Sequence, residues 1–345
     1  MFCKKKFLAI AVLSAVCINT NALALSNDSN NVTTEKNYIK SFAFEAPDAS
    51  HISFEDLIEI GKAKMREMGF EQDWISDLPE KEIASFADVE SATVSTQYLR
   101  FPRQSNTNSI SSTSDVEILT KEEFEQAVAE QRQQEMEAYE QWKSGSQPFK
   151  DDIFFDGLMK FTTTCARTDP KSDYKVSARY EWVGSCNPEL TDVFGICPAP
   201  DTYPDTETPY AVNKYTERIE SRVTGKVTVN NHKQEFTSHN QFDYKPGAES
   251  TNGYGIKVPL PKIQISASTR KFYSNICGYI SYNMHFTQNI RRDFQIYGTY
   301  AHQTNRLGPV SISASFPPGG ISLAPSILYS FKTNSLPVHE TYTPY

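Results

Sequence analysis

Residues 215–229, YTERIESRVTGKVTV, decide the fold class of this chain. Apolar side chains occupy one set of alternating positions, namely Tyr215, Ile219, Val223, Val227 and Val229. Polar and charged side chains occupy the other set, namely Thr216, Arg218, Glu220, Arg222, Thr224 and Lys226. Successive side chains of a β-strand point to opposite faces, so this alternation predicts a half-buried strand. We expect a turn at Asn230 and Asn231, followed by a return strand.

Similar alternation recurs on both sides of this stretch. Val176, Ala178, Tyr180 and Trp182 mark an earlier strand, and later strands are expected at residues 263–267, 278–286, 294–302, 310–316 and 321–331. No helical pattern of useful length separates these segments, so we expect them to pair antiparallel. Because one face of each strand is apolar and the other polar, the pattern predicts a β-sandwich or partly open β-barrel of about eight to ten strands.

The residues before this β region have a helical pattern and a different charge. Residues 25–150 carry 24 acidic and 12 basic side chains, whereas residues 151–345 carry 18 and 19. Capping boxes at Ser53 with Asp56, and at Thr120 with Glu123, predict helices over residues 53–69 and 120–143. The fold class is therefore α+β in sequence order. The segments are 1–24, a signal peptide; 25–150, an acidic, partly helical and partly disordered region; and 151–345, an antiparallel β domain.

The first 24 residues have the pattern of a secretory signal. Lys4, Lys5 and Lys6 precede an apolar run at 7–18, and small residues at Ala22 and Ala24 predict cleavage after Ala24. The pattern is of the bacterial type and predicts a secreted protein, either extracellular or periplasmic. No later run approaches eighteen apolar residues, so we expect no stable transmembrane segment. The acidic balance argues against nucleic acid as a partner.

Four cysteines remain after this segment is removed. An even number in an oxidising compartment predicts two disulfides. We expect Cys186 to pair with Cys197 across a proline-bearing turn, and Cys165 to pair with Cys277 across distant strands. The spacing of cysteine and histidine indicates no zinc site or other cofactor.

Two histidines are the first suspects for catalysis. His285 and His302 lie on predicted strands, and either Asp293 or Asp243 would complete an acid/base set with them. The alternative is that both histidines form local hydrogen bonds. The motifs of zinc proteases and of serine hydrolases with a nucleophile elbow are absent. The sequence therefore leaves enzymatic activity uncertain and favours a protein without it.

Two tyrosines are candidates for ligand binding. Tyr279 and Tyr297 fall at positions expected to point outward, where aromatic rings can stack on sugars. Ordinary cross-strand pairing explains the same pattern. With His285 and His302, these tyrosines form our set of candidate binding residues.

Three hypotheses on function remain. The favoured one is a secreted or periplasmic binding or surface-interaction module, whose ligand or cell-surface partner is unknown. The second is a secreted hydrolase with a site around His285, His302 and Asp293. The third is a membrane-active or pore-forming β protein, suggested by the serine-rich alternation of residues 311–330.

Overall fold

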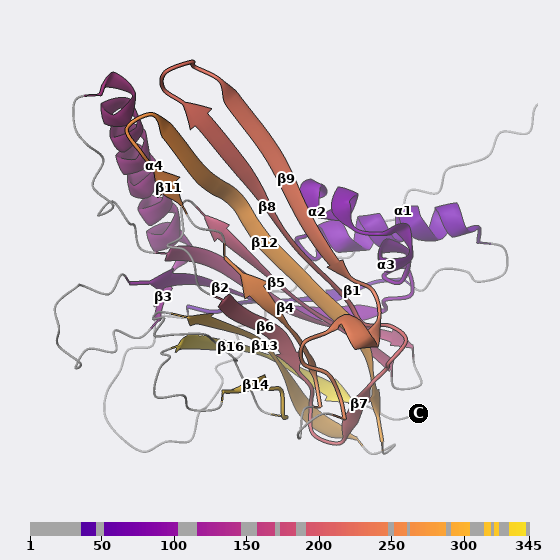
Figure 1. The fold of residues 1–345 in the computed structure, drawn as a ribbon. Coiled ribbons are helices and arrows are strands. Elements are labelled where there is room, and N and C mark those ends of the chain that lie inside the picture. The colour runs from indigo at the N-terminus through magenta and orange to yellow at the C-terminus, as the bar shows by residue number, and fades with distance from the viewer. Residues whose placement is uncertain are drawn as a thin grey trace, which may run out of the picture.

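A computed structural model describes residues 36–45, 52–102, 116–145, 157–169, 173–183, 191–247, 252–260, 263–287, 291–303, 314–318, 321–323 and 331–342. The predicted signal peptide, Cys186 and most of the serine-rich segment lie outside these residues. In the described part the protein is built mostly of antiparallel strands, which form two large sheets and a short ribbon (Figure 1). Neither large sheet closes into a barrel, so the predicted sandwich class is confirmed.

The larger sheet has ten strands. Its main path runs in the order β1 (Tyr38–Ala43), β2 (Ser91–Phe101), β4 (Gly157–Asp169), β5 (Asp173–Val183), β12 (Thr269–Phe286), β8 (Tyr210–Ser221) and β9 (Val227–Phe236). Three short strands pair beside this path: β3 (Glu117–Leu119) with β2, and β7 (Thr202–Pro204) and β11 (Gln264–Ile265) with β12. β12 is the longest strand at 18 residues, and both β5 and β8 pair with it.

The smaller sheet covers one face of the larger one. It runs in the order β10 (Tyr254–Pro259), β6 (Thr191–Cys197), β13 (Arg292–Gln303) and β16 (Phe331–Tyr342). Apolar and aromatic side chains from both sheets fill the space between them, among them Phe161, Tyr180, Phe194 and Tyr300. The ribbon consists of β14 (Ala314–Ser315) and β15 (Ser322–Leu323), and a 3-10 turn spans His239–Gln241.

Helices cover the opposite face of the larger sheet. At one end lie α1 (Phe54–Glu67), α2 (Gln72–Asp77) and α3 (Glu80–Ala84), which bury Met65, Trp74 and Ile83 against the strands. The long helix α4 (Lys121–Ser144) lies toward the other end (Figure 1). Both predicted capping boxes are present, at Ser53 and at Thr120. Gly145 ends α4 in the left-handed conformation with φ of 73°, which glycine adopts without steric cost.

The turn of the β8–β9 hairpin, at one edge of the larger sheet, differs from the expected one. β8 ends at Ser221 and β9 begins at Val227, so Asn230 and Asn231 lie inside β9 and the turn lies upstream of them. Gly225 has a φ of 66°, and its amide donates to the carbonyl of Ser221 over 2.8 Å. The glycine supplies the positive φ that this turn requires, which is why the chain reverses there.

Strands from both sides of residue 150 share the larger sheet. β2 pairs with β4 from Ser91 opposite Arg167 to Phe101 opposite Gly157. The region 25–150 therefore supplies β1, β2 and β3 as well as the helices. That residues 151–345 form an independent domain stays a prediction. Because β2 pairs with β4 across this boundary, the prediction is tested by removing the residues before 151.

The expected bridge between Cys165 and Cys277 is wrong. Both thiols are buried and neither forms a disulfide. Cys165 packs in the core between the two sheets, whereas Cys277 packs under α1–α3 on the other face. β5 lies between their two strands, so the thiols are separated by the thickness of the sheet and by a strand. Because Cys186 lies outside the described residues, its pairing with Cys197 stays a prediction.

Candidate functional site

Part of the larger sheet extends past the smaller one (Figure 1). We call this part the arm and define it as residues 216–231, at the joined ends of β8 and β9, together with residues 269–274 of β12. Paired residues point to the same face of an antiparallel sheet. The register therefore places Arg218, Phe272 and Val229 side by side on the helix-bearing face, and Glu220, Arg270 and Val227 in the next row.

The tip of the arm exposes apolar side chains. Val223 is 78% exposed, Val229 56% and Val227 42%. They make up half of the large apolar side chains that are exposed in the described residues, the others being Phe54, Met136 and Tyr203. Scattered single residues of this kind are ordinary on a protein surface, whereas these three lie on one hairpin.

Arginines lie beside these valines. The guanidinium of Arg270 stacks on Phe272 at 4.6 Å and on Tyr139 of α4 at 5.2 Å. Arg270 is 9% exposed, and its Nε has no hydrogen-bond partner in the described structure. Burial lowers the pKa of this guanidinium. The guanidinium of Arg218 also lies over the Phe272 ring, 5.7 Å from its centroid, and its side chain is 44% exposed. The helix-bearing face of the arm thus carries Arg218 and Arg270 together with Glu220, which lies 4.0 Å from Arg218.

The C-terminal end of α4 braces the arm. Trp142 donates from Nε1 to the carbonyl of Ser266 over 2.9 Å, and its own carbonyl accepts from Arg222 over 3.3 Å. Tyr139 donates to Glu220 over 2.6 Å. Phe124 and Ala127 are buried at one end of α4 and Trp142 at the other, and Gln131 and Ala138 between them are buried as well.

The opposite face of the arm carries a polar network. Glu217 bonds with Lys271, accepts from Asn230 over 2.9 Å, and lies 3.7 Å from His232. The hydrogen bond from Lys271 is the largest cause that lowers the pKa of Glu217 to about 2. Tyr215 stacks on His232 with ring centroids 4.5 Å apart. This network stiffens the arm where the smaller sheet does not cover it.

The two candidate histidines lie at opposite ends of β5. His285 Nδ1 lies 2.6 Å from Asp173, the first residue of that strand. His302 contacts Trp182, near the last residue, with ring centroids 5.3 Å apart. His285 and His302 therefore lie far apart and do not share one site.

The proposed carboxylate partners lie elsewhere too. Asp293 accepts from the hydroxyl of Thr341 over 2.7 Å, and Asp243 accepts from the amide of Lys257 over 2.8 Å. The partner of His302 is Asp192, 3.0 Å away, which is fully buried and also accepts from Tyr300 over 2.6 Å. Sequence reasoning missed Asp192 because it lies 110 residues from His302. Its hydrogen bonds join β6 to β13.

The two candidate tyrosines occupy different surroundings. Tyr279 was expected to face outward, but it is fully buried under α1–α3 and donates to Glu82 over 2.6 Å. The strand pattern identified its face correctly, but not the helices that cover that face. Tyr297 is half-buried and bonds with Gln295, two residues away on the same strand. Tyr279 and Tyr297 therefore do not form a shared stacking surface for a ligand.

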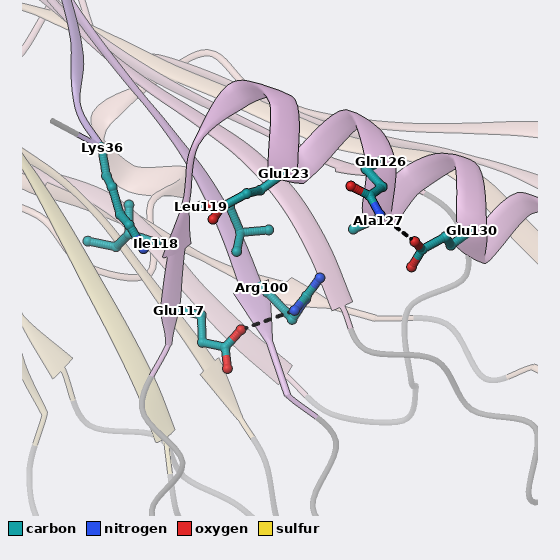
Figure 2. A pocket seen from close by; sticks show the side chains of 9 residues that line it. All are labelled: Lys36, Arg100, Glu117, Ile118, Leu119, Glu123, Gln126, Ala127 and Glu130. Atoms are coloured by element: carbon teal, nitrogen blue, oxygen red, sulfur yellow. Dashed lines mark hydrogen bonds and ion pairs between the residues drawn. The ribbon is translucent and has the colours of Figure 1, made fainter. Parts of the chain in front are cut away.

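A cavity of about 440 Å³ lies between β2, β3 and the first turns of α4 (Figure 2). Its lining consists of Lys36, Arg100, Glu117, Ile118, Leu119, Glu123, Gln126, Ala127 and Glu130. Arg100 pairs with Glu117 at 3.3 Å, and Gln126 donates to Glu130 over 2.8 Å. Glu123 is engaged in the cap of α4. The lining carries no histidine, cysteine or hydroxyl nucleophile and contains none of the candidate residues.

Comparisons with known proteins give no family. No family model matches the chain, and no curated protein matches it. Among solved structures, a pore-forming protein is 7% identical with a TM-score of 0.15, covering 56% of this chain and 93% of its own. The membrane-inserted form of the Clostridium perfringens NetB toxin is 9% identical with a TM-score of 0.17, covering 57% and 97%. Similarity this low supports no conclusion on fold or function. No helix among the described residues is long and apolar enough to cross a membrane.

Proposed function

We propose that this chain is an exported surface-interaction protein and that it contacts its partner through the arm. The observation that carries the proposal is the group of exposed valines, Val223, Val227 and Val229, on one hairpin. Burial of these apolar side chains against a partner removes them from water, which favours binding. The bracing by Trp142 and the Glu217 network hold the hairpin in one conformation, which lowers the entropy lost on binding.

A hydrolytic function has less support. His285, His302 and Asp293 belong to separate hydrogen-bonded groups, and the cavity near α4 contains none of them. General acid–base catalysis requires such groups within hydrogen-bond reach of one reacting atom. The described geometry therefore favours binding over catalysis.

The arm also lacks the character of a membrane-spanning hairpin. A spanning strand needs one face that is apolar over about ten residues. In β8 both faces carry charges, because Glu217 points to one side and Arg218 and Glu220 to the other. The arm is suited to contact a surface rather than to cross it.

The proposal is tested with the full mature chain, labelled at its N-terminus, on a panel of immobilised glycans, matrix proteins, lipid vesicles and intact cells. A Val227→Thr/Val229→Thr variant removes the apolar contact and keeps β-branched side chains in the strand. The control is Tyr203→Thr, which removes an equally exposed apolar side chain from β7. At least one surface should retain wild type and control and lose the arm variant. If no surface separates the arm variant from the control, the proposal is wrong.

A further inference from the structure

The charge of the hairpin differs from that of the whole protein. The chain has a formal net charge of −8. Between Arg218 and Val229, however, the basic residues Arg218, Arg222 and Lys226 face a single acid, Glu220. Glu220 is 8% exposed, accepts from Tyr139 and lies 4.0 Å from Arg218, so it offsets one of the three cations and the segment keeps an excess of positive charge.

From this arrangement we propose that the arm binds the surface of a bilayer containing anionic phospholipids. The inference rests on the proposed function and names its partner. Arg222, which also donates to the carbonyl of Trp142, and Lys226 lie on either side of Val223 along the chain. Val223 is the most exposed large apolar side chain in the described part of the chain. An anionic membrane surface is complementary to the tip of the arm, because its negative headgroups attract the cations and its apolar interior accepts the valine.

The charge pattern also sets the orientation of binding. The acidic body is repelled by an anionic surface, whereas the cationic tip is attracted to it, so contact is made end-on through the hairpin. Arg218, further along the same face, reaches lipid phosphates once the tip is seated. Arginine forms two parallel hydrogen bonds with a phosphate, which suits this role.

The apolar residues favour lipid over a glycan partner. Sugar sites in proteins rely on exposed aromatic faces, but the one ring on this face of the arm, Phe272, is covered by Arg218 and Arg270. Valine offers no planar surface for a sugar. Apolar side chains next to lysine and arginine are instead typical of segments that lie at the boundary between headgroups and acyl chains.

The test is flotation of the full mature chain with vesicles of pure phosphatidylcholine and with vesicles containing 30 mol% phosphatidylserine, a composition of the order found in strongly anionic membranes. We expect wild type to float with the anionic vesicles alone and to be released by about 0.5 M NaCl, since salt screens surface charge. Each neutralised cation near an anionic surface weakens binding about five-fold, so Arg218→Gln/Lys226→Gln should bind about 25-fold more weakly.

Matched variants separate the possible outcomes. Val223→Thr should reduce binding to anionic vesicles, whereas Lys245→Gln, which removes a cation outside the arm, should leave it unchanged. Far-ultraviolet circular dichroism and the thermal midpoint of each variant must match wild type. If wild type does not prefer anionic vesicles, the inference is wrong. If the Val227→Thr/Val229→Thr variant then still loses another surface of the panel, the arm remains the contact site, and only its assigned partner is overturned.

Discussion

The carboxylate of Glu82 accepts a 2.6 Å hydrogen bond from the hydroxyl of Tyr279, and this contact ties α3 to the middle of β12. The same carboxylate accepts from Ser281 over 2.7 Å and from Lys175 over 3.1 Å. Glu82 is 7% exposed and Lys175 is 2% exposed, so the ion pair is shielded from water. The N-terminal helices are thus attached to the sheet through a polar anchor as well as through apolar packing.

Replacing Glu82 should destabilise the whole fold. In Glu82→Ala the ammonium of Lys175 stays buried without its counter-charge, and breaking a buried pair in this way costs about 3–5 kcal/mol. The double variant Glu82→Leu/Lys175→Met removes both charges and should recover the part of the loss that comes from the unpaired ammonium, while Tyr279 and Ser281 still lack their acceptor. Urea denaturation followed by fluorescence measures both. Equal destabilisation by the single and double variants would show that the charge pair is not the cause.

The stabilising effect of Glu217 should depend on pH. Its folded-state pKa is lowered from 4.5 to about 2, chiefly by the hydrogen bond from Lys271. A lowered pKa stabilises the fold above the unfolded-state value, and the contribution disappears as pH falls through the folded-state value. The difference in unfolding free energy between wild type and Glu217→Gln should therefore be constant above about pH 5 and shrink between pH 4.5 and 2. A difference that stays constant over this interval would contradict the assignment.

The turn at Gly225 should tolerate only residues that accept a positive φ. An added Cβ would meet no atom within 4 Å, so the cost of substitution is conformational rather than steric crowding. Gly225→Val should lower stability by about 1–2 kcal/mol, because β-branched residues avoid the left-handed region. Gly225→Asn, which tolerates that region, is the matched control and should cost less than half as much. Thermal unfolding of the two variants would refute the turn assignment if both behaved alike.

The buried thiols should resist modification in the native state. Burial raises the pKa of Cys277 to about 12, which leaves almost no thiolate to react with iodoacetamide at pH 8. We expect Cys165 and Cys277 to be labelled only after denaturation, without a reducing agent. Peptide mapping of the unreduced protein tests the predicted Cys186–Cys197 bridge in the same experiment. A peptide linking Cys165 to Cys277 would contradict the fold.

Local chemistry could be predicted from the sequence, but tertiary pairing could not. The caps at Ser53 and Thr120 and the helices behind them depend on residues three apart, so the sequence contains all that determines them. The apolar and polar alternation of residues 278–286 also places Tyr279 correctly on the face of β12 that points away from the smaller sheet. It does not reveal that α1–α3 cover this face, or that the carboxylate near His302 comes from Asp192. Those relationships depend on topology, which a strand period does not encode.

The alternation within residues 91–101 was a usable signal that the sequence analysis missed. Val94, Thr96 and Tyr98 have high strand propensity, and their spacing of two fits a strand. Helical and polar patterns on both sides mask this signal, so the sequence predicts a partly helical and partly disordered region there. The structure places it inside the larger sheet as β2, and its contacts bear on how the chain is divided into domains.

Truncation tests that division. A chain starting at residue 151 would lack β2, and the backbone of β4 would lose its partner along eleven residues. Leu99 and Phe101 would also leave the core between the sheets. An exposed, long and apolar strand edge promotes aggregation. We therefore expect residues 151–345, exported to an oxidising compartment, to aggregate or to unfold without a cooperative transition.

A chain starting at residue 36 is the matched control, since it keeps every described strand. It should unfold cooperatively, as measured by circular dichroism during heating. A chain starting at residue 90 distinguishes the contribution of β2 from that of the residues before it, because it retains β2 but lacks β1, α1–α3 and the Glu82 anchor. We expect it to fold with lower stability and to expose Tyr279. Cooperative unfolding of residues 151–345 alone would instead establish an autonomous β domain and make β2 an accessory strand.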